Sequence, residues 1–228
     1  MIDITRHVAD LVQERPSRAR VFEALGINYC CGGAVPFRDA VAAKGLDPEA
    51  IARTMAAGEA AQAQDSEADV TAMSSAELVD HIVTTYHDAL RRELPRLREM
   101  VDKVAEGHGH EDPRLPALRD LYVAFERDIY AHLAAEEEKL FPQIRHGVNG
   151  NAEGIAGIIR EMEAEHDSAA QALEAMRGVT DGYTAAEGAC NSTRATLAAL
   201  AELEGAMHRH VHTENNVLFP RFRAPSKM

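Results

Sequence analysis

The chain has 228 residues, 46% of them hydrophobic and only 5% aromatic, and its formal net charge is -13 at pH 7. This acidic balance argues against nucleic acid and against an anionic membrane as partners, because both repel negative charge. No apolar run approaches the ~20 residues that span a bilayer, and residues 1–20 lack the apolar core of a signal peptide. We therefore expect a cytoplasmic protein, and its wealth of Ala, Leu and Glu favours helix throughout.

Residues 1–58 predict a small N-terminal helical domain whose short helices are interrupted by the turn NYCCGG, which holds Cys30 and Cys31. A chain with 3 cysteines lacks a disulfide framework, and cytoplasmic thiols stay reduced. A thiol exposed just before a helix has a lowered pKa, so this pair is a candidate for redox exchange, for capture of metal or nitric oxide, or for transfer to a partner. The alternative is a glycine-rich turn whose cysteines have no chemical role.

Residues 59–73 show no apolar periodicity and predict a linker, whereas residues 74–228 predict a bundle of four long helices. A capping box from Ser74 to Glu77 opens the first helix, and apolar residues then recur at alternating spacings of four and three. Short connections between long helices predict an all-α, up-down-up-down four-helix bundle. The connection between the third and fourth helices is expected to run back along the length of the bundle.

Six polar side chains occupy seam positions that are otherwise apolar. The second and fourth helices each carry a His-x-x-x-Glu pair followed by Leu-Phe-Pro, and the other two helices carry one histidine each. An i, i+4 spacing places both members of a pair on one helix face. The six candidates are His87, His132, Glu136, His166, His210 and Glu214.

Two carboxylates in a bundle core need a compensating charge, and no Arg or Lys lies on the seam at their level. A multivalent metal ion is the expected partner. Imidazole and carboxylate without thiolate suit iron, manganese or zinc better than copper(I). The set exceeds the needs of one tetrahedral zinc and divides over two ions, with two histidines for each ion, Glu136 and Glu214 bridging, and an oxo or hydroxo bridge.

Other polar residues near the seams receive lesser roles. His108 lies 21 residues from His87, about 30 Å along a helix, and is excluded as a ligand. His208 and His212 are expected near the solvent edge of the last helix. Asp128 is expected to support His132, Glu137 and Glu165 are expected on a solvated face, and Cys190 is expected to be inert.

Three motifs resemble those of the hemerythrin-like di-iron domain: HLAAE from His132 to Glu136, EAEHD around His166, and HVHTENNVLFP from His210 to Pro220. Together with NYCCGG, they make essentially the whole chain similar to the repair of iron centres family. The resemblance implies that the six candidates bind two iron ions and that Cys30 and Cys31 are the family's cysteine pair. It implies a cytosolic protein that repairs iron–sulfur clusters damaged by nitrosative or oxidative stress, by donating iron.

The resemblance also implies the partners, which are damaged or apo iron–sulfur proteins together with O2 or NO as small ligands, and it allows a homodimer. Whether the protein is an enzyme stays open. Reduction of nitric oxide to nitrous oxide at the di-iron site, or reversible binding of O2 or NO by a sensor, are the alternatives to iron donation.

Overall fold

The computed structural model describes residues 2–61, 70–146 and 152–223. Within them no strand forms beyond one isolated bridge between His7 and Pro36, so the all-α prediction is confirmed. The chain divides into two compact units, residues 1–74 with 208–221 and residues 75–207 with the residues from 222 onward. Because the boundary falls inside the last long helix, that helix belongs to both units.

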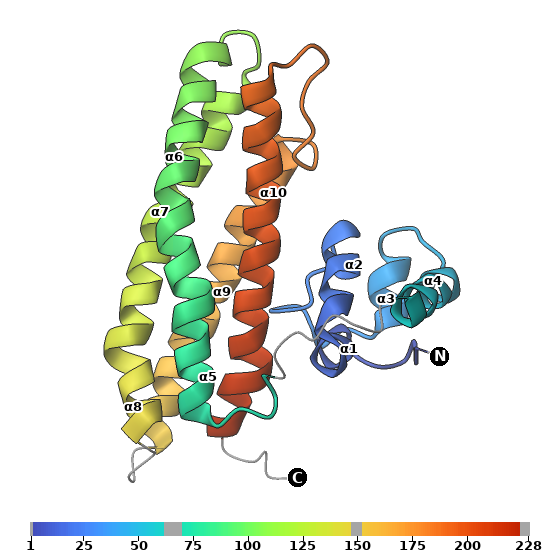
Figure 1. Cartoon of the computed structure of the whole chain (residues 1–228), viewed down its shortest axis with the longest axis vertical. Helices are drawn as coiled ribbons and strands as arrows, with labels where there is room; N and C mark the ends of the chain where they lie inside the picture. Colours follow the sequence, from blue (N-terminus) through green and yellow to red (C-terminus); the bar gives the residue numbers. More distant parts are fainter. Residues whose placement is uncertain (1, 62–69, 147–151, 224–228) are drawn as a thin grey trace. The chain divides into compact units, whose positions relative to one another are not determined.

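The larger unit is the predicted up-down-up-down bundle, in which α7 packs against both α6 and α9 (Figure 1). Its first two long helices are each interrupted by one π-helical turn. The connection between α9 and α10 rises along the bundle, as expected. Its elements are α5 (Ser75–Ile82), η2 (Val83–His87), α6 (Asp88–His108), α7 (Arg114–Ala135), η3 (Glu136–Leu140), α8 (Phe141–His146), α9 (Ala152–Val179) and most of α10 (Asn191–His212). The end of α10 is grouped with the smaller unit, as are η4 (Thr213–Leu218) and nearly all of η5 (Phe219–Phe222).

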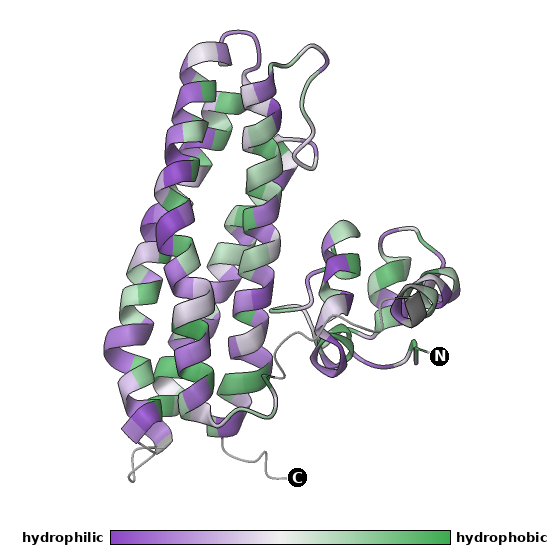
Figure 2. Cartoon of the chain, in the orientation of Figure 1, coloured by the Kyte–Doolittle hydropathy of each residue, from purple (hydrophilic) through white to green (hydrophobic). Residues whose placement is uncertain are grey.

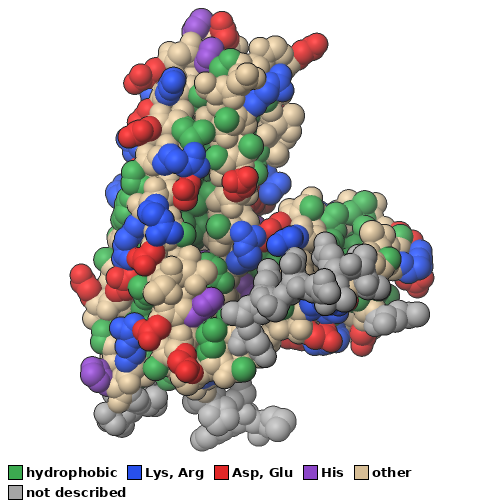
Figure 3. All heavy atoms as spheres, in the orientation of Figure 1, with side chains coloured by type: hydrophobic (Ala, Val, Ile, Leu, Met, Phe, Trp, Pro, Cys, Tyr) green, Lys and Arg blue, Asp and Glu red, His purple; other side chains and the backbone are tan. Residues whose placement is uncertain are grey.

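Amphipathic helices hold this bundle together. Figure 2 shows hydrophobic and hydrophilic residues alternating along each long helix, and Figure 3 shows both signs of charge interspersed on its visible face. The seam of α6 is buried as predicted, with Leu94 and Val101 at 0% exposure. Tyr122 of α7 is also fully buried, and its hydroxyl donates a 2.7 Å hydrogen bond to the Leu94 carbonyl. Among the residues that the structure describes, none of the helices could span a bilayer.

The smaller unit contains short helices around an aromatic cluster, in which Phe22 contacts Tyr29 and Phe37 at ring-centroid distances of 6.1 and 6.0 Å. The buried guanidinium of Arg18 binds Glu59 at 2.6 Å and so ties the first helices to the last one. Residues 62–69 of the predicted linker lie outside the described residues. The helices of residues 1–74 are α1 (Val8–Glu14), η1 (Pro16–Arg18), α2 (Ala19–Ala24), α3 (Phe37–Ala42) and α4 (Pro48–Ala61).

We expect Tyr122→Phe to lower the free energy of unfolding by about 1 kcal/mol, because it removes a buried hydrogen bond without opening a cavity. Tyr130→Phe is the matched control, since Tyr130 lies on the same helix and is 37% exposed. Urea titration of the two metal-free variants compares them directly. Equal losses in both would show that the Tyr122 hydroxyl contributes nothing specific to the bundle.

Candidate metal centre

Three π-helical turns carry or adjoin the predicted ligands. His87 ends η2, Glu136 begins η3 and Glu214 is the second residue of η4. A π turn holds one extra residue, so it rotates the side chains ahead of it relative to those behind it, and such turns are frequent at functional sites. The helical periodicity of the sequence indicated these residues but not the π-helical turns that direct them.

Glu136 and Glu214 each accept, through the backbone carbonyl, the hydrogen bond that defines their π turn. The backbone N–H of Phe141 donates to the Glu136 carbonyl, and that of Phe219 donates to the Glu214 carbonyl, five residues back in each case. The next residue in both places is proline, which has no N–H to continue the ordinary α-helical pattern. The repeated Leu-Phe-Pro was therefore the available sequence signal for the widened turns.

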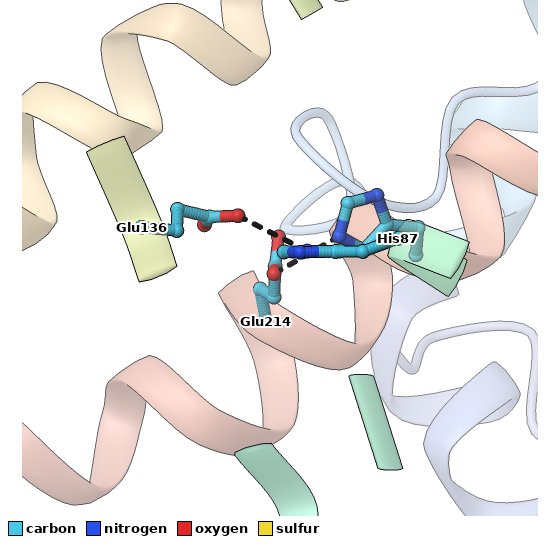
Figure 4. Close-up of side chains that lie close together, drawn as sticks. His87, Glu136 and Glu214 are labelled. Atoms are coloured by element: carbon cyan, nitrogen blue, oxygen red, sulfur yellow. Dashed lines mark hydrogen bonds and ion pairs between the residues drawn. The ribbon is translucent and has the colours of Figure 1, made fainter. Parts of the chain in front are cut away.

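The structure brings all six predicted residues together in two buried groups that share both glutamates. Within each group, one imidazole nitrogen or carboxylate oxygen per residue lies within 4.8 Å of all the others. Figure 4 shows His87, Glu136 and Glu214 pointing toward one another from three helical segments. The groups are His87, Glu136, His210 and Glu214, and His132, Glu136, His166 and Glu214.

The Glu136 carboxylate shows why this cluster suits a cation. The side chain is fully buried, yet within the described part of the chain neither oxygen has a hydrogen-bond partner. Three imidazole Nε2 atoms face it instead, at 3.3 Å for His87, 3.5 Å for His132 and 4.0 Å for His166. An ionised carboxylate is very costly to bury in this state, and a metal ion between the oxygens and the nitrogens would remove that cost.

Two of the imidazoles are oriented by carboxylates on their outer sides. His87 Nδ1 lies 2.7 Å from Glu137 Oε1, and His132 Nδ1 lies 2.7 Å from Glu165 Oε2. A nitrogen that faces a carboxylate carries the proton and donates it to the hydrogen bond, so each Nε2 presents a lone pair to the core. Glu137 and Glu165 therefore orient these imidazoles. Their side chains are 30% and 48% exposed, as expected of a solvated face, but the sequence did not indicate their contacts with the histidines.

Burial by itself raises the pKa of the Glu137 carboxyl, but hydrogen bonds from His87 and Arg91 outweigh it and hold the pKa below its ordinary value. The Arg91 guanidinium lies 2.7 Å from the same oxygen that faces His87. The carboxylate thus stays charged at neutral pH and fixes the tautomer of His87.

The imidazoles of His132 and His166 also face each other in the core. His132 Nε2 and His166 Nε2 are 3.0 Å apart in the buried core. Because His132 Nδ1 already donates to Glu165, the two Nε2 atoms repel each other unless a proton or a metal ion lies between them. On the other side of the cluster, His210 Nε2 lies 3.0 Å from Glu214 Oε1. This donor set fits a metal ion that takes nitrogen and oxygen ligands.

Two neighbouring expectations are wrong. Asp128 forms an ion pair with Arg127 on the surface and is 65% exposed, so it does not support His132. His208 and His212 are buried, and both rings contact Tyr29, at centroid distances of 5.8 and 5.4 Å. Helical phase within the bundle could not reveal a covering residue from another part of the chain.

Hydrogen bonds from its own backbone close the turn that holds Cys30 and Cys31. The Asn28 side-chain oxygen accepts hydrogen bonds from the backbone N–H groups of Cys30, Cys31 and Gly32 at 3.1, 3.1 and 3.3 Å. Gly33 approaches its neighbours so closely that a Cβ there would lie 2.4 Å from the Tyr29 carbonyl oxygen. Cys30 is buried and Cys31 half-buried, so the expectation of exposed thiols is wrong for Cys30.

The same turn contacts the π-helical turn η4. The Asn216 amide donates to the Cys30 carbonyl at 3.2 Å, and the Asn215 amide lies 3.8 Å from the Cys31 sulfur. The two sulfurs are 3.9 Å apart and are not joined in a disulfide. Since Glu214 directly precedes Asn215, the cysteine turn contacts the segment that carries a predicted ligand.

A helical bundle whose core gathers four histidines around two shared glutamates is a metal-binding bundle of the hemerythrin type. A family model described as "Hemerythrin HHE cation binding domain" matches residues 78–222, and a second, a domain of unknown function named ScdA_N, matches residues 4–59.

Curated relatives cover nearly the whole chain. A probable iron-sulfur cluster repair protein of Haemophilus influenzae is 32% identical over 94% of this chain and 95% of its own length. The iron-sulfur cluster repair protein ScdA of Staphylococcus haemolyticus is 33% identical over 94% and 96%. The iron-sulfur cluster repair protein YtfE of Citrobacter koseri is 34% identical over 94% of each. The chain therefore belongs to the family of iron–sulfur cluster repair proteins with a hemerythrin HHE cation binding domain.

We expect Glu137→Ala and Glu165→Ala each to weaken metal binding roughly 10- to 100-fold, because the loss of either carboxylate frees the tautomer and orientation of its histidine. Glu138→Ala is the matched control, since Glu138 lies beside Glu137 on the exposed side of the same turn. Competition for Fe2+ against a chromophoric chelator gives the three affinities. Affinities equal to that of the control would show that the outer carboxylates do not tune the site.

Proposed function

We propose that this chain is a non-haem di-iron protein that repairs iron–sulfur clusters damaged by nitrosative or oxidative stress, by donating iron. The observation that carries the proposal is the pair of buried His–Glu groups that share Glu136 and Glu214. Two groups with common carboxylates are suited to two adjacent ions. The names of the relatives, which are iron–sulfur cluster repair proteins, support the same role.

In this proposal each iron ion is held by two histidines, and both carboxylates bridge the pair. His87 and His210 bind one ion, and His132 and His166 bind the other. Four neutral imidazoles and two carboxylates offset only two of the four positive charges of two ferrous ions. A buried site with this residual charge holds ferrous iron less firmly than a carboxylate-rich one.

The low charge of the ligand set favours release to an iron–sulfur protein. The cysteine ligands of an apo cluster site are thiolates, which are charged and form the usual ligand set of iron–sulfur clusters. Moving ferrous iron from imidazole to thiolate is therefore favourable. The bundle thus supplies the ions from a buried site that its own residues shield from water.

Cys30 and Cys31 are assigned a thiol role in this transfer. Their contact with η4 places two sulfurs beside the segment that carries Glu214. A thiol there can accept iron as it leaves and pass it to a client protein. The clients are damaged or apo iron–sulfur proteins, and the cytoplasm, where such proteins and reduced thiols occur, is the proposed location.

The test is transfer of iron to an apo [2Fe–2S] protein in the presence of sulfide, followed by the visible absorption of the cluster. A weak chelator that traps free Fe2+ but does not strip the loaded protein is present throughout. We expect cluster formation with the wild-type chain and none with Glu136→Ala/Glu214→Ala, which lacks the bridging carboxylates. Transfer no faster than from the same concentration of free Fe2+ would contradict the proposal.

The role of Cys30 and Cys31 is tested by comparing the iron-transfer rates of cysteine variants. Cys30→Ser/Cys31→Ser is expected to bind iron as the wild type does but to transfer it several-fold more slowly, while Cys190→Ser, far along the bundle, transfers normally. Unchanged transfer by the double variant would remove the cysteines from the mechanism and leave donation by the bundle intact.

A second candidate function is the reduction of nitric oxide to nitrous oxide, and the adjacency of the two groups favours it, because two neighbouring ions can bring two NO molecules together. The readout is nitrous oxide formed per di-iron centre with an added electron donor. More than one turnover would make the protein an enzyme, and no nitrous oxide would exclude this candidate. A sensor that binds O2 or NO reversibly would give neither nitrous oxide nor iron transfer.

A further inference from the structure

A second cluster of reactive groups lies at the other end of the bundle, where α6 ends and α10 begins. Cys190 directly precedes Asn191, the first residue of α10, a helix of 22 residues. Its sulfur lies 3.4 Å from the Thr193 hydroxyl and 3.2 Å from Nε2 of His108, the last residue of α6. His108 lies 21 residues along the helix from His87, so this cluster is about 30 Å from the metal centre.

A third side chain orients the imidazole. Glu111 Oε2 lies 3.3 Å from His108 Nδ1, on the far side of the ring from the sulfur. The order carboxylate, imidazole, thiol is the arrangement in which a base activates a nucleophile while a third group fixes the tautomer of the base. Residues 82 positions apart in the chain make this contact, which distinguishes it from an isolated surface cysteine.

The groups line a cavity of about 190 Å3. Its wall also contains the acidic residues Asp112 and Glu187, and Asp112 is paired with Arg114 at 2.8 Å. Histidine and acidic side chains gather at this end of the bundle in Figure 3. A cavity of this size and charge admits a small neutral molecule and disfavours anions.

The surroundings also stabilise the thiolate. Hydrogen bonds from the Thr193 side chain and backbone, together with one from the Ser192 backbone and the nearby His108, outweigh the opposing effect of desolvation and lower the pKa of the Cys190 thiol to about 7. The helix N-terminus acts in the same direction, whereas the acidic groups Glu111 and Glu187 oppose it.

We propose that Cys190, His108 and Glu111 form a reactive-thiol site that is oxidised by small neutral peroxides, separate from the metal centre. The expectation that Cys190 is inert is replaced by this assignment. Nothing in it depends on iron donation, so either proposal can fail alone.

The reaction balances as a two-electron transfer. The thiolate sulfur attacks one oxygen of hydrogen peroxide, a sulfur–oxygen bond forms and the oxygen–oxygen bond breaks. The proton that the thiol gave to His108 passes to the departing oxygen, which leaves as water. Sulfur is oxidised from thiol to sulfenic acid while the peroxide is reduced. Glu111 keeps the imidazole oriented for both proton transfers.

The test begins with alkylation of the full chain by iodoacetamide from pH 5 to 10, with the modified peptides quantified so that each cysteine is followed separately. We expect a midpoint near pH 7 for Cys190 and a higher one in His108→Asn, in which the hydrogen bonds from Thr193 remain. At pH 7 the wild-type rate should exceed that of the variant by up to about threefold, since a larger thiolate fraction is partly offset by lower intrinsic nucleophilicity. Lys103→Ala, also on α6, is the control and should leave the midpoint in place.

A brief exposure to stoichiometric hydrogen peroxide, followed by dimedone, then detects the sulfenic acid. Labelling at Cys190 that falls several-fold in His108→Asn supports the proposal. Two outcomes overturn it: a Cys190 midpoint unchanged by His108→Asn, which leaves only a helix-capping role, or a shifted midpoint without dimedone labelling, which leaves a polarised thiol that does not react with peroxide. Circular dichroism and metal content verify that His108→Asn is folded.

Discussion

The burial of two carboxylates is the constraint on which the rest of the structure depends. Glu136 and Glu214 are both fully buried, and buried histidines face them in a core that is otherwise mostly apolar. A carboxylate in such surroundings needs a compensating positive charge, and the surrounding side chains supply imidazole nitrogens rather than guanidinium or ammonium groups. A bound metal ion would account for the polar core, and the π-helical turns and outer carboxylates position the side chains that would hold it.

Two local features achieve that positioning. The π-helical turns redirect the side chains of Glu136 and Glu214 without breaking the helices, and the prolines that follow prevent a return to ordinary hydrogen bonding at once. Outside the core, Glu137 and Glu165 bind the Nδ1 atoms of their histidines and leave Nε2 for a metal ion. The same helices therefore bury the predicted ligands and carry the carboxylates that orient them.

Much of this was predictable from the sequence because the signals are local. Seam spacing along single helices placed His87 and the two His-x-x-x-Glu pairs on core faces, and four such helices predict a bundle. Contacts between distant parts of the chain were not predictable. Glu165 reaches His132 from another helix, Tyr29 covers the face of His208 and His212, and His108 meets Cys190 only after the chain has turned twice. Phase along one helix carries no information about such neighbours, so the contacts of Glu165, His208 and His212 were not foreseen.

The most direct test of the account is the position of the metal itself. Anomalous X-ray diffraction at the iron edge, from crystals of the full chain loaded anaerobically with Fe2+, locates each ion independently of its ligands. The account predicts two peaks in the bundle core, one beside His87 and His210 and one beside His132 and His166, with Glu136 and Glu214 between them. A single peak, or iron bound at Cys30 and Cys31 while the core stays empty, would contradict it.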